Sequence, residues 1–176
     1  MFKRMSCGLI SEGEVMANDL SGTKTEKNLL RAFASESQVR SKYVYFAEKA
    51  RIEGYDQVAA IFEETAAHEV EHAKMWFKLL NGNDTPTTEE NLKTAIDGEK
   101  DETDIIYPQM AQEAMEEGFI NIATLFEQVG EIEKDHEERF MKVLDNMAAL
   151  KNTTSVHICK NCGHMVEDLS VRKMKY

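Results

Sequence analysis

Two segments of this chain carry the same pair of polar residues inside an apolar helical stripe. In residues 56–80, the residues on one side of a predicted helix recur at alternating intervals of four and three. They are Val58, Phe62, Thr65, Glu69, His72, Trp76 and Leu79. Residues 119–150 repeat these intervals with Ile122, Phe126, Val129, Glu133, His136, Phe140, Val143 and Met147. A Glu-x-x-His pair therefore lies in the middle of each stripe, where a polar side chain is costly unless it is paired or binds a metal ion.

A helix is also predicted ahead of these two segments, beginning near Thr23 and running toward Gly54. Thr23 followed by Glu26 is a capping-box signature, and an apolar stripe continues from there. Glu36 lies on this stripe. The first predicted helix thus turns one acid toward the same core.

A further helix is predicted from Thr88 to about Gly118, and Pro108 is expected to kink it. Its apolar stripe contains two acids, Glu99 and Glu102. All four predicted helices therefore point acids inward.

Four helices of this length, joined mostly by short connections, predict an all-α fold with an antiparallel four-helix bundle over residues 21–150. The stretch between the second and third helices leaves a crossover open, and exchange of helices between chains is open as well. Residues 1–20 lack periodicity and are predicted to be a flexible lead, in which Met16 is a candidate natural start. Residues 151–176 mix β-branched residues with a C-x-x-C sequence and are predicted to be a small non-helical tail.

Composition and charge limit the classes of function. Two prolines and nine glycines among 176 residues argue against an all-β fold. A net charge of -11 disfavours nucleic acid and anionic membranes as partners. Residues 1–15 hold no apolar run long enough for a signal peptide, and three cysteines with one C-x-x-C pair fit a reducing compartment. We expect a cytoplasmic protein.

The inward-pointing acids and histidines predict a metal site. Several carboxylates in one core repel each other or take up protons unless a cation is present. A Glu from some helices and Glu-x-x-His from two others is the pattern by which ferritin-like bundles hold two iron or two manganese ions. The predicted ligands are Glu36, Glu69, His72, Glu99, Glu102, Glu133 and His136. The alternative is a metal-free bundle whose polar core residues pair with one another.

The charge of these ligands predicts a change on reduction. Five carboxylates come close to the charge of two ferric ions and exceed that of two ferrous ions. Exchanging one carboxylate for a neutral histidine would match the ferrous charge. We therefore predict that a redox change moves one iron between Glu102 and His72.

The helical segments resemble the rubrerythrin family, from residue 23 to about residue 150 and partly beyond. The similar stretches are TEKNLLRAFASESQVRSKYVYF, IFEETAAHEVEHAKMWFKLL, DGEKDETDIIYP and EKDHEERF. The second Glu of the third helix distinguishes this family from plain ferritins. The resemblance implies a homodimeric, ferritin-like protein whose two iron ions reduce hydrogen peroxide to water, with electrons from a rubredoxin-type site.

The resemblance also implies roles for the carboxylates. Glu69 and Glu133 would bridge the two irons. Glu36 and Glu102 would bind one of them.

The remaining ligands and two tyrosines follow from the same resemblance. Glu99 and His136 would bind the second iron, and His72 would be the alternate ligand. Tyr43 and Tyr107 match the family's tyrosines that hydrogen-bond to ligands and orient them.

The tail resembles half of a rubredoxin-type site. Cys159 and Cys162 form one C-x-x-C pair, and no second pair follows, so four thiolates cannot meet within one chain. Three interpretations remain, in decreasing order of preference. The tail is a remnant without metal, a half-site that binds iron or zinc with a second chain, or a site with His157 or His164 as extra ligands. Without an internal relay, electrons arrive from a separate donor such as free rubredoxin.

These patterns predict a non-haem di-iron peroxidase acting in oxidative-stress defence. The first rival is a ferroxidase or iron-handling protein, which would use dioxygen and assemble into a cage. The second rival is a bundle that serves only as an interaction module, and a metal content near zero would favour it.

Overall fold

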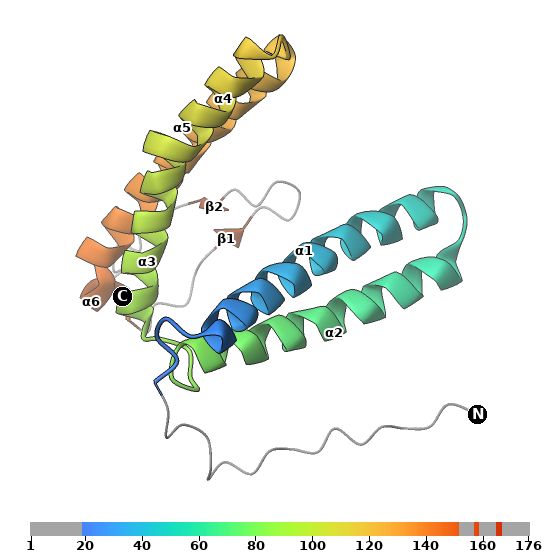
Figure 1. Ribbon diagram of the computed structural model, residues 1–176, viewed down its shortest axis with the longest axis horizontal. Helices are drawn as coiled ribbons and strands as arrows, with labels where there is room; N and C mark the ends of the chain where they lie inside the picture. The colour runs from blue at the N-terminus through green and yellow to red at the C-terminus, as the bar shows by residue number, and fades with distance from the viewer. Residues whose placement is uncertain (1–18, 152–156, 159–164, 167–176) are drawn as a thin grey trace, which may run out of the picture. The chain divides into compact units, whose positions relative to one another are not determined.

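The computed structural model describes residues 19–151, 157–158 and 165–166. Nearly all of these residues are helical (Figure 1). They belong to two compact units that divide between Pro86 and Thr87. Each unit has its own helical hairpin.

The first unit is a hairpin of two long helices, α1 (Lys24–Ile52) and α2 (Asp56–Leu80), which run antiparallel (Figure 1). A short turn joins them at Gly54, whose φ is 84°. Glycine adopts this left-handed conformation without the steric cost of a Cβ atom, so it ends α1 and reverses the chain. Both helices match the predicted bounds within two residues. We call this unit the first hairpin.

The N-terminus of α1 confirms half of the predicted capping box. The Thr23 hydroxyl accepts a hydrogen bond from the Glu26 N–H at 3.0 Å. The Glu26 carboxylate accepts from the Gly22 N–H at 2.7 Å and not from Thr23. The reason is that the Thr23 N–H already donates to the Leu20 carbonyl.

Small residues form the contact between α1 and α2. Ala47 and Ala59 are 2% and 0% exposed, and Ala66 and Ala73 continue the buried row on α2 at seven-residue intervals. The stripe that carries Glu69 and His72 lies beside this row, and its larger members stay partly open; Val58 is 43% exposed. The alanine contact was not predicted, because the larger apolar residues dominated the pattern.

The second unit packs three consecutive helical segments against one long helix. The segments α3 (Thr88–Asp101), the π-helical turn η1 (Glu102–Ile106) and α4 (Tyr107–Glu116) follow one another without a break, antiparallel to α5 (Ile120–Asp145) (Figure 1). We call this unit the second hairpin. The buried small residues are Ala111, Ala114, Ala123 and Gly130.

The predicted third helix contains a π-helical turn that the sequence analysis did not anticipate. The Tyr107 N–H donates to the carbonyl of Glu102, five residues earlier. Pro108 has no N–H, and its ring excludes the carbonyl four residues before it, so α-helical bonding fails in this turn. The irregularity expected at Pro108 therefore lies in the turn before it and begins at Glu102.

The predicted fourth helix is not continuous to residue 150. It breaks at Asn146 into α5 and the short α6 (Met147–Leu150). The Asn146 side chain donates to the Lys142 carbonyl at 2.8 Å, in competition with the backbone donors. Asparagine favours helix ends because its side chain offers this alternative bond.

The described part of the tail consists of two short antiparallel strands, β1 (His157–Ile158) and β2 (Met165–Val166). Cys159, Cys162 and most of the predicted lead lie outside the described residues. Among the described helices, none has the length and apolar character needed to cross a membrane.

Candidate metal centre

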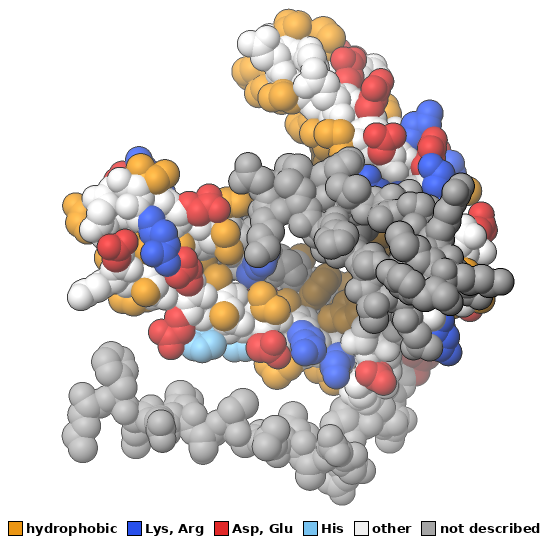
Figure 2. Space-filling model, turned by 180° about the vertical axis from the view of Figure 1, so that it is seen from behind, with side chains coloured by type: hydrophobic (Ala, Val, Ile, Leu, Met, Phe, Trp, Pro, Cys, Tyr) orange, Lys and Arg blue, Asp and Glu red, His pale blue; other side chains and the backbone are white. Residues whose placement is uncertain are grey.

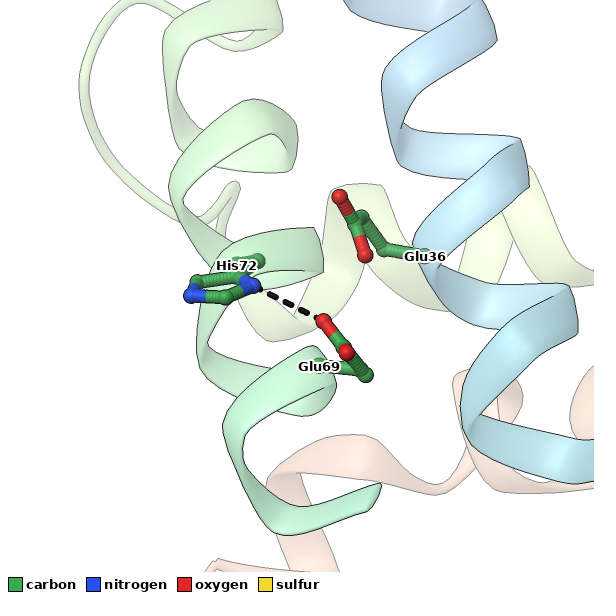
Figure 3. Close-up of side chains that lie close together, drawn as sticks. All are labelled: Glu36, Glu69 and His72. Atoms are coloured by element: carbon green, nitrogen blue, oxygen red, sulfur yellow. Dashed lines mark hydrogen bonds and ion pairs between the residues drawn. The ribbon is translucent and has the colours of Figure 1, made fainter. Parts of the chain in front are cut away.

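The first hairpin brings together three of the predicted ligands. Glu36 comes from α1, and Glu69 and His72 come from α2, with the three side chains pointing toward one another (Figure 3). One ligand atom of each lies within 4.8 Å of the other two. His72 Nδ1 lies 2.8 Å from Glu69 Oε2, an interaction that the helical i, i+3 spacing permits. We call this group the first half-site.

The second hairpin repeats the arrangement with Glu99 from α3 and Glu133 and His136 from α5. Their ligand atoms also lie within 4.8 Å of one another. His136 Nδ1 is 2.6 Å from Glu133 Oε2 and 3.7 Å from Glu99 Oε2. This second half-site has the same composition as the first, with one Glu facing a Glu-x-x-His pair.

The two carboxylates of the first half-site are close enough to share a proton. The pKa of Glu36 is raised, first because its carboxyl hydrogen-bonds to that of Glu69, then because of burial and the negative charge of Glu69. His72 acts in the opposite direction. Two such groups cannot both ionise easily without a nearby cation.

The second half-site shows the same effect with a different leading cause. The pKa of Glu99 is raised mainly by burial, and then by its hydrogen bond with the Glu133 carboxyl and the charge of Glu133. Glu102 adds repulsion, and His136 opposes these effects. Glu99 and Glu133 have side chains that are only 22% and 15% exposed, so water does little to relieve the repulsion.

Glu102 and Tyr107 lie next to the second half-site without belonging to its group of three. Glu102 is half-buried at the start of η1, and the bond from Tyr107 N–H to its carbonyl stacks the two residues on one side of the helix. Burial and the charges of Glu102, Glu133 and Glu99, in that order, raise the pKa of Tyr107. This shift favours the neutral phenol further, and the neutral phenol can donate a hydrogen bond.

Tyr43 occupies an aromatic cluster of the first hairpin. Its ring centroid is 5.7 Å from that of Phe62 and 6.2 Å from that of Phe46. Within the described part of the chain, neither its hydroxyl nor that of Tyr107 forms a hydrogen bond to a ligand. The predicted role of both tyrosines in orienting ligands stays a prediction.

Gly130 is a site residue that the sequence analysis missed. A Cβ atom at this position would lie 3.2 Å from Tyr107 Cβ, so any larger residue would force α5 and Tyr107 apart by a few tenths of an ångström. The Thr103 hydroxyl donates to the Gly130 carbonyl at 3.4 Å. Gly130 lies three residues before Glu133, and this spacing on one helix was the available signal.

The donor set of each half-site fits a metal ion of the predicted kind. Carboxylate oxygen and imidazole nitrogen suit iron, manganese and zinc. The pKa of Glu36 is raised first by its hydrogen bond with Glu69 and that of Glu99 first by burial, and in both the charge of the neighbouring Glu adds to the effect, which a cation would offset. Which residues share one centre across the two hairpins stays a prediction, as does the role of Cys159 and Cys162.

Comparison with known proteins gives a consistent family. The Rubrerythrin family model matches residues 27–144. The rubrerythrin of Porphyromonas gingivalis is 39% identical over 174 residues, covering 90% of this chain and 87% of that protein. The rubrerythrin of Nitratidesulfovibrio vulgaris is 39% identical over 163 residues, covering 84% of this chain and 85% of that protein. A solved structure of nigerythrin in a partially reduced state is 31% identical and has a TM-score of 0.39. The match covers 88% of this chain and 82% of the nigerythrin chain.

Helical hairpins that each present Glu and Glu-x-x-His, in groups that could hold a metal ion, are typical of the ferritin-like class. The family model covers most of the chain, and the curated relatives agree with it. The chain belongs to the rubrerythrin family. The all-α, ferritin-like class and the predicted family are thereby confirmed, and the family places the chain among iron-binding oxidoreductases.

Proposed function

We propose that the protein is a di-iron peroxidase that reduces hydrogen peroxide to water. The observation that carries this proposal is the matched pair of half-sites, each with two close carboxylates and a histidine. The predicted centre combines them, with Glu102 as the seventh ligand. Membership of the rubrerythrin family supports the same reaction.

The proposed reaction consumes two electrons and two protons for each hydrogen peroxide and forms two water molecules. When bound, two ferrous ions supply one electron each. The protein holds the ligands in place: the i, i+3 spacing fixes His72 beside Glu69 and His136 beside Glu133. These residues are on helices and not on loops, so their positions vary little.

Tyr107 is the residue we propose for positioning and for donating a hydrogen bond to a ligand carboxylate. Its raised pKa keeps the hydroxyl protonated, and Gly130 lets it lie close against α5. The charge count predicts that a redox change moves one iron between Glu102 and His72. Glu102 is half-buried, and the His72 side chain is 47% exposed in its hairpin.

The electron donor that we propose is a rubredoxin-type protein, in keeping with membership of the rubrerythrin family. Steady turnover of peroxide by the iron-loaded protein with reduced rubredoxin, and loss of turnover without it, would support this part. A variant with Cys159→Ser and Cys162→Ser separates a role of the tail from the role of the donor.

The test of the reaction is anaerobic stopped-flow mixing of the iron-loaded, reduced protein with peroxide and, separately, with dioxygen. The ferric absorbance is followed in both. We expect oxidation by peroxide to be much faster. If dioxygen is equally fast and added ferrous iron keeps turning over, the peroxidase proposal is wrong and iron oxidation is the better account.

A further inference from the structure

The helix α2 carries a sequence that the proposed centre uses only in part. Residues 68–72 read H-E-V-E-H, which matches the H-E-x-x-H pattern by which one helix holds a zinc ion between two histidines. The proposed centre accounts for Glu69 and His72 and gives His68 no role. His68 is exposed, so its imidazole is open to ions in the solvent.

The helix brings His68 and His72 to one side of the first hairpin. Residues four apart in an α-helix are neighbours on its surface, with Cβ atoms about 5–6 Å apart. Side chains also tilt toward the N-terminus of their helix, so the His72 ring leans over the turn that contains His68 and Glu69. Figure 2 shows histidine side chains at the surface of the first hairpin, with acidic side chains beside them. This spacing lets two imidazoles bind a single ion.

The His72 ring connects the first half-site with the surface. Its Nδ1 lies 2.8 Å from Glu69 Oε2, and Figure 3 shows its other ring nitrogen turned away from Glu36 and Glu69. The His72 side chain is 47% exposed, whereas that of Glu69 is 15% exposed. A histidine that binds a metal through one nitrogen commonly donates its other N–H to a carboxylate, which fixes the ring. His72 therefore has one nitrogen for Glu69 and one for an ion at the surface.

The second half-site provides an internal comparison, because it has the same donor set without the extra histidine. Glu133 and His136 correspond to Glu69 and His72, and the residue four before His136 is Ile132. Ile132 is 51% exposed, so an apolar side chain takes the surface position that His68 has on α2. Of the two half-sites, only the first has a second imidazole spaced to bind the same ion.

Acidic side chains near this histidine pair favour a cation. Glu64 lies four residues before His68 and Glu71 three residues after it, and both are exposed. Lys74, at 3.9 Å, offsets part of the charge of Glu71. Imidazole nitrogen suits zinc, copper, nickel and iron. The group therefore fits a divalent cation and would repel an anion.

We propose that His68 and His72 form an outer site for a divalent cation, through which ferrous iron enters the first half-site. The ion binds first to the exposed nitrogens of the two histidines. Rotation of the His72 side chain then brings the ion to Glu69 and Glu36. The loading role rests on the proposed function, namely that the half-sites hold iron. The outer site does not depend on it.

Copper(II) is the probe for the outer site, because its electron paramagnetic resonance spectrum reports how many imidazole nitrogens bind it. The metal-free protein is titrated with copper in a background of Cys159→Ser and Cys162→Ser, which removes the tail thiols as competitors. We expect this protein to bind one copper ion through two histidine nitrogens. His68→Ile, which copies the second half-site, should lose that signal. A two-nitrogen spectrum unchanged by His68→Ile would overturn the outer site.

The matched control adds the missing histidine to the other half-site. Ile132→His places an imidazole four residues before His136, and both positions are at least partly exposed. We expect a second copper ion bound through two nitrogens. Circular dichroism checks that the variants keep their helices. A folded Ile132→His protein without this gain would contradict the argument from helical spacing.

The loading role is tested by the rate at which ferrous iron enters the metal-free protein. Under anaerobic conditions, samples are quenched at intervals with a colour-forming chelator, which reports the iron not yet bound. We expect His68→Ile to take up iron several-fold more slowly than wild type and to reach the same final content, since every ligand of the proposed centre remains. Equal rates would overturn the loading role. If wild type retains no iron, the proposed function fails together with the loading role, and the copper experiment still decides the outer site.

Discussion

Gly130 and Tyr107 illustrate how one residue without a side chain sets the position of another beside the candidate centre. The close approach of α5 to Tyr107 holds the phenol among Glu99, Glu102 and Glu133. At this scale the chemistry depends on distances of a few tenths of an ångström. Protein interiors are packed densely enough that such differences change stability.

Gly130→Ala should lower the free energy of unfolding by about 1 kcal/mol, because overpacking costs more than the gain in helix propensity. The Cβ atom would lie 3.2 Å from Tyr107 Cβ, an atom fixed to its backbone. Gly98→Ala is the matched control, since no atom lies within 4 Å of a Cβ there, and it should stabilise the protein. Urea unfolding measures both. Equal stabilisation by the two substitutions would mean that Gly130 has no packing role.

The raised pKa values of Glu36 and Glu99 predict a pH dependence for the metal-free protein. Their pKa values are raised above the ordinary 4.5, so the folded state binds more protons than the unfolded state. Stability from these groups is present below pH 4.5 and is lost as pH rises through the raised pKa values. Denaturation with a chelator present, followed across this range, measures the loss. Glu36→Gln should flatten the profile, and Glu48→Gln on the exposed side of α1 should not.

At the scale of elements, helix ends and interruptions have identifiable local causes. Thr23 and Thr87 cap α1 and α3, Asn146 ends α5, and Pro108 forces the π-turn at Glu102. The π-turn changes which residues face α5 after Glu102. It therefore decides where Tyr107 lies, which regular α-helical spacing from Glu102 would not predict.

Thr87→Ala should weaken the start of α3 by about 1 kcal/mol, the usual contribution of such a cap. The Thr87 hydroxyl accepts from the Glu90 N–H at 3.3 Å, and the Thr87 N–H donates to the Glu90 carboxylate at 2.8 Å. The Thr87 hydroxyl also donates to the Glu90 carboxylate at 2.6 Å, and this bond, followed by the one from the Thr87 N–H, lowers the pKa of Glu90. The contribution of Glu90 to stability is therefore present above pH 4.5 and is lost as pH falls through the lowered pKa. Urea unfolding of Thr87→Ala and of the control Thr88→Ala, at neutral and acid pH, measures both effects.

At the scale of the whole molecule, stability and metal binding should be linked. Each hairpin presents its own group of one Glu and a Glu-x-x-His pair, so an ion held by such a group would bind only when that hairpin is folded. A ligand that binds only the folded state stabilises it in proportion to the logarithm of its concentration. We therefore expect metal binding to raise the stability of the protein.

Adding ferrous iron to the metal-free protein under anaerobic conditions should raise the melting temperature, and a chelator should reverse the rise. At 100 times the dissociation constant, the stabilisation expected is about 2.7 kcal/mol. Glu69→Gln and Glu133→Gln should lose most of it, whereas Glu71→Gln, an exposed acid of α2, should retain it. Differential scanning calorimetry measures the shift. Equal shifts in all three variants would place the metal elsewhere.

The helices and their polar residues were predictable from sequence, because both follow from local spacing. Apolar residues at intervals of three and four identify a helix face, and Glu69 and Glu133 stand out because they interrupt it. The same spacing placed Glu36 and Glu99 close enough to the Glu-x-x-His pairs to form the two half-sites. The π-turn was not predictable, because the spacing around Glu102 reads equally well as regular helix.

By itself, the sequence determined the helical class, the family and the side chains of the candidate centre, since periodicity, composition and motif are properties of neighbours along the chain. Only the tertiary structure decided that alanines form the helix contacts and that Gly130 makes room for Tyr107. These depend on distances between residues far apart in sequence. Local patterns do not contain such distances, because packing sets them when the chain folds.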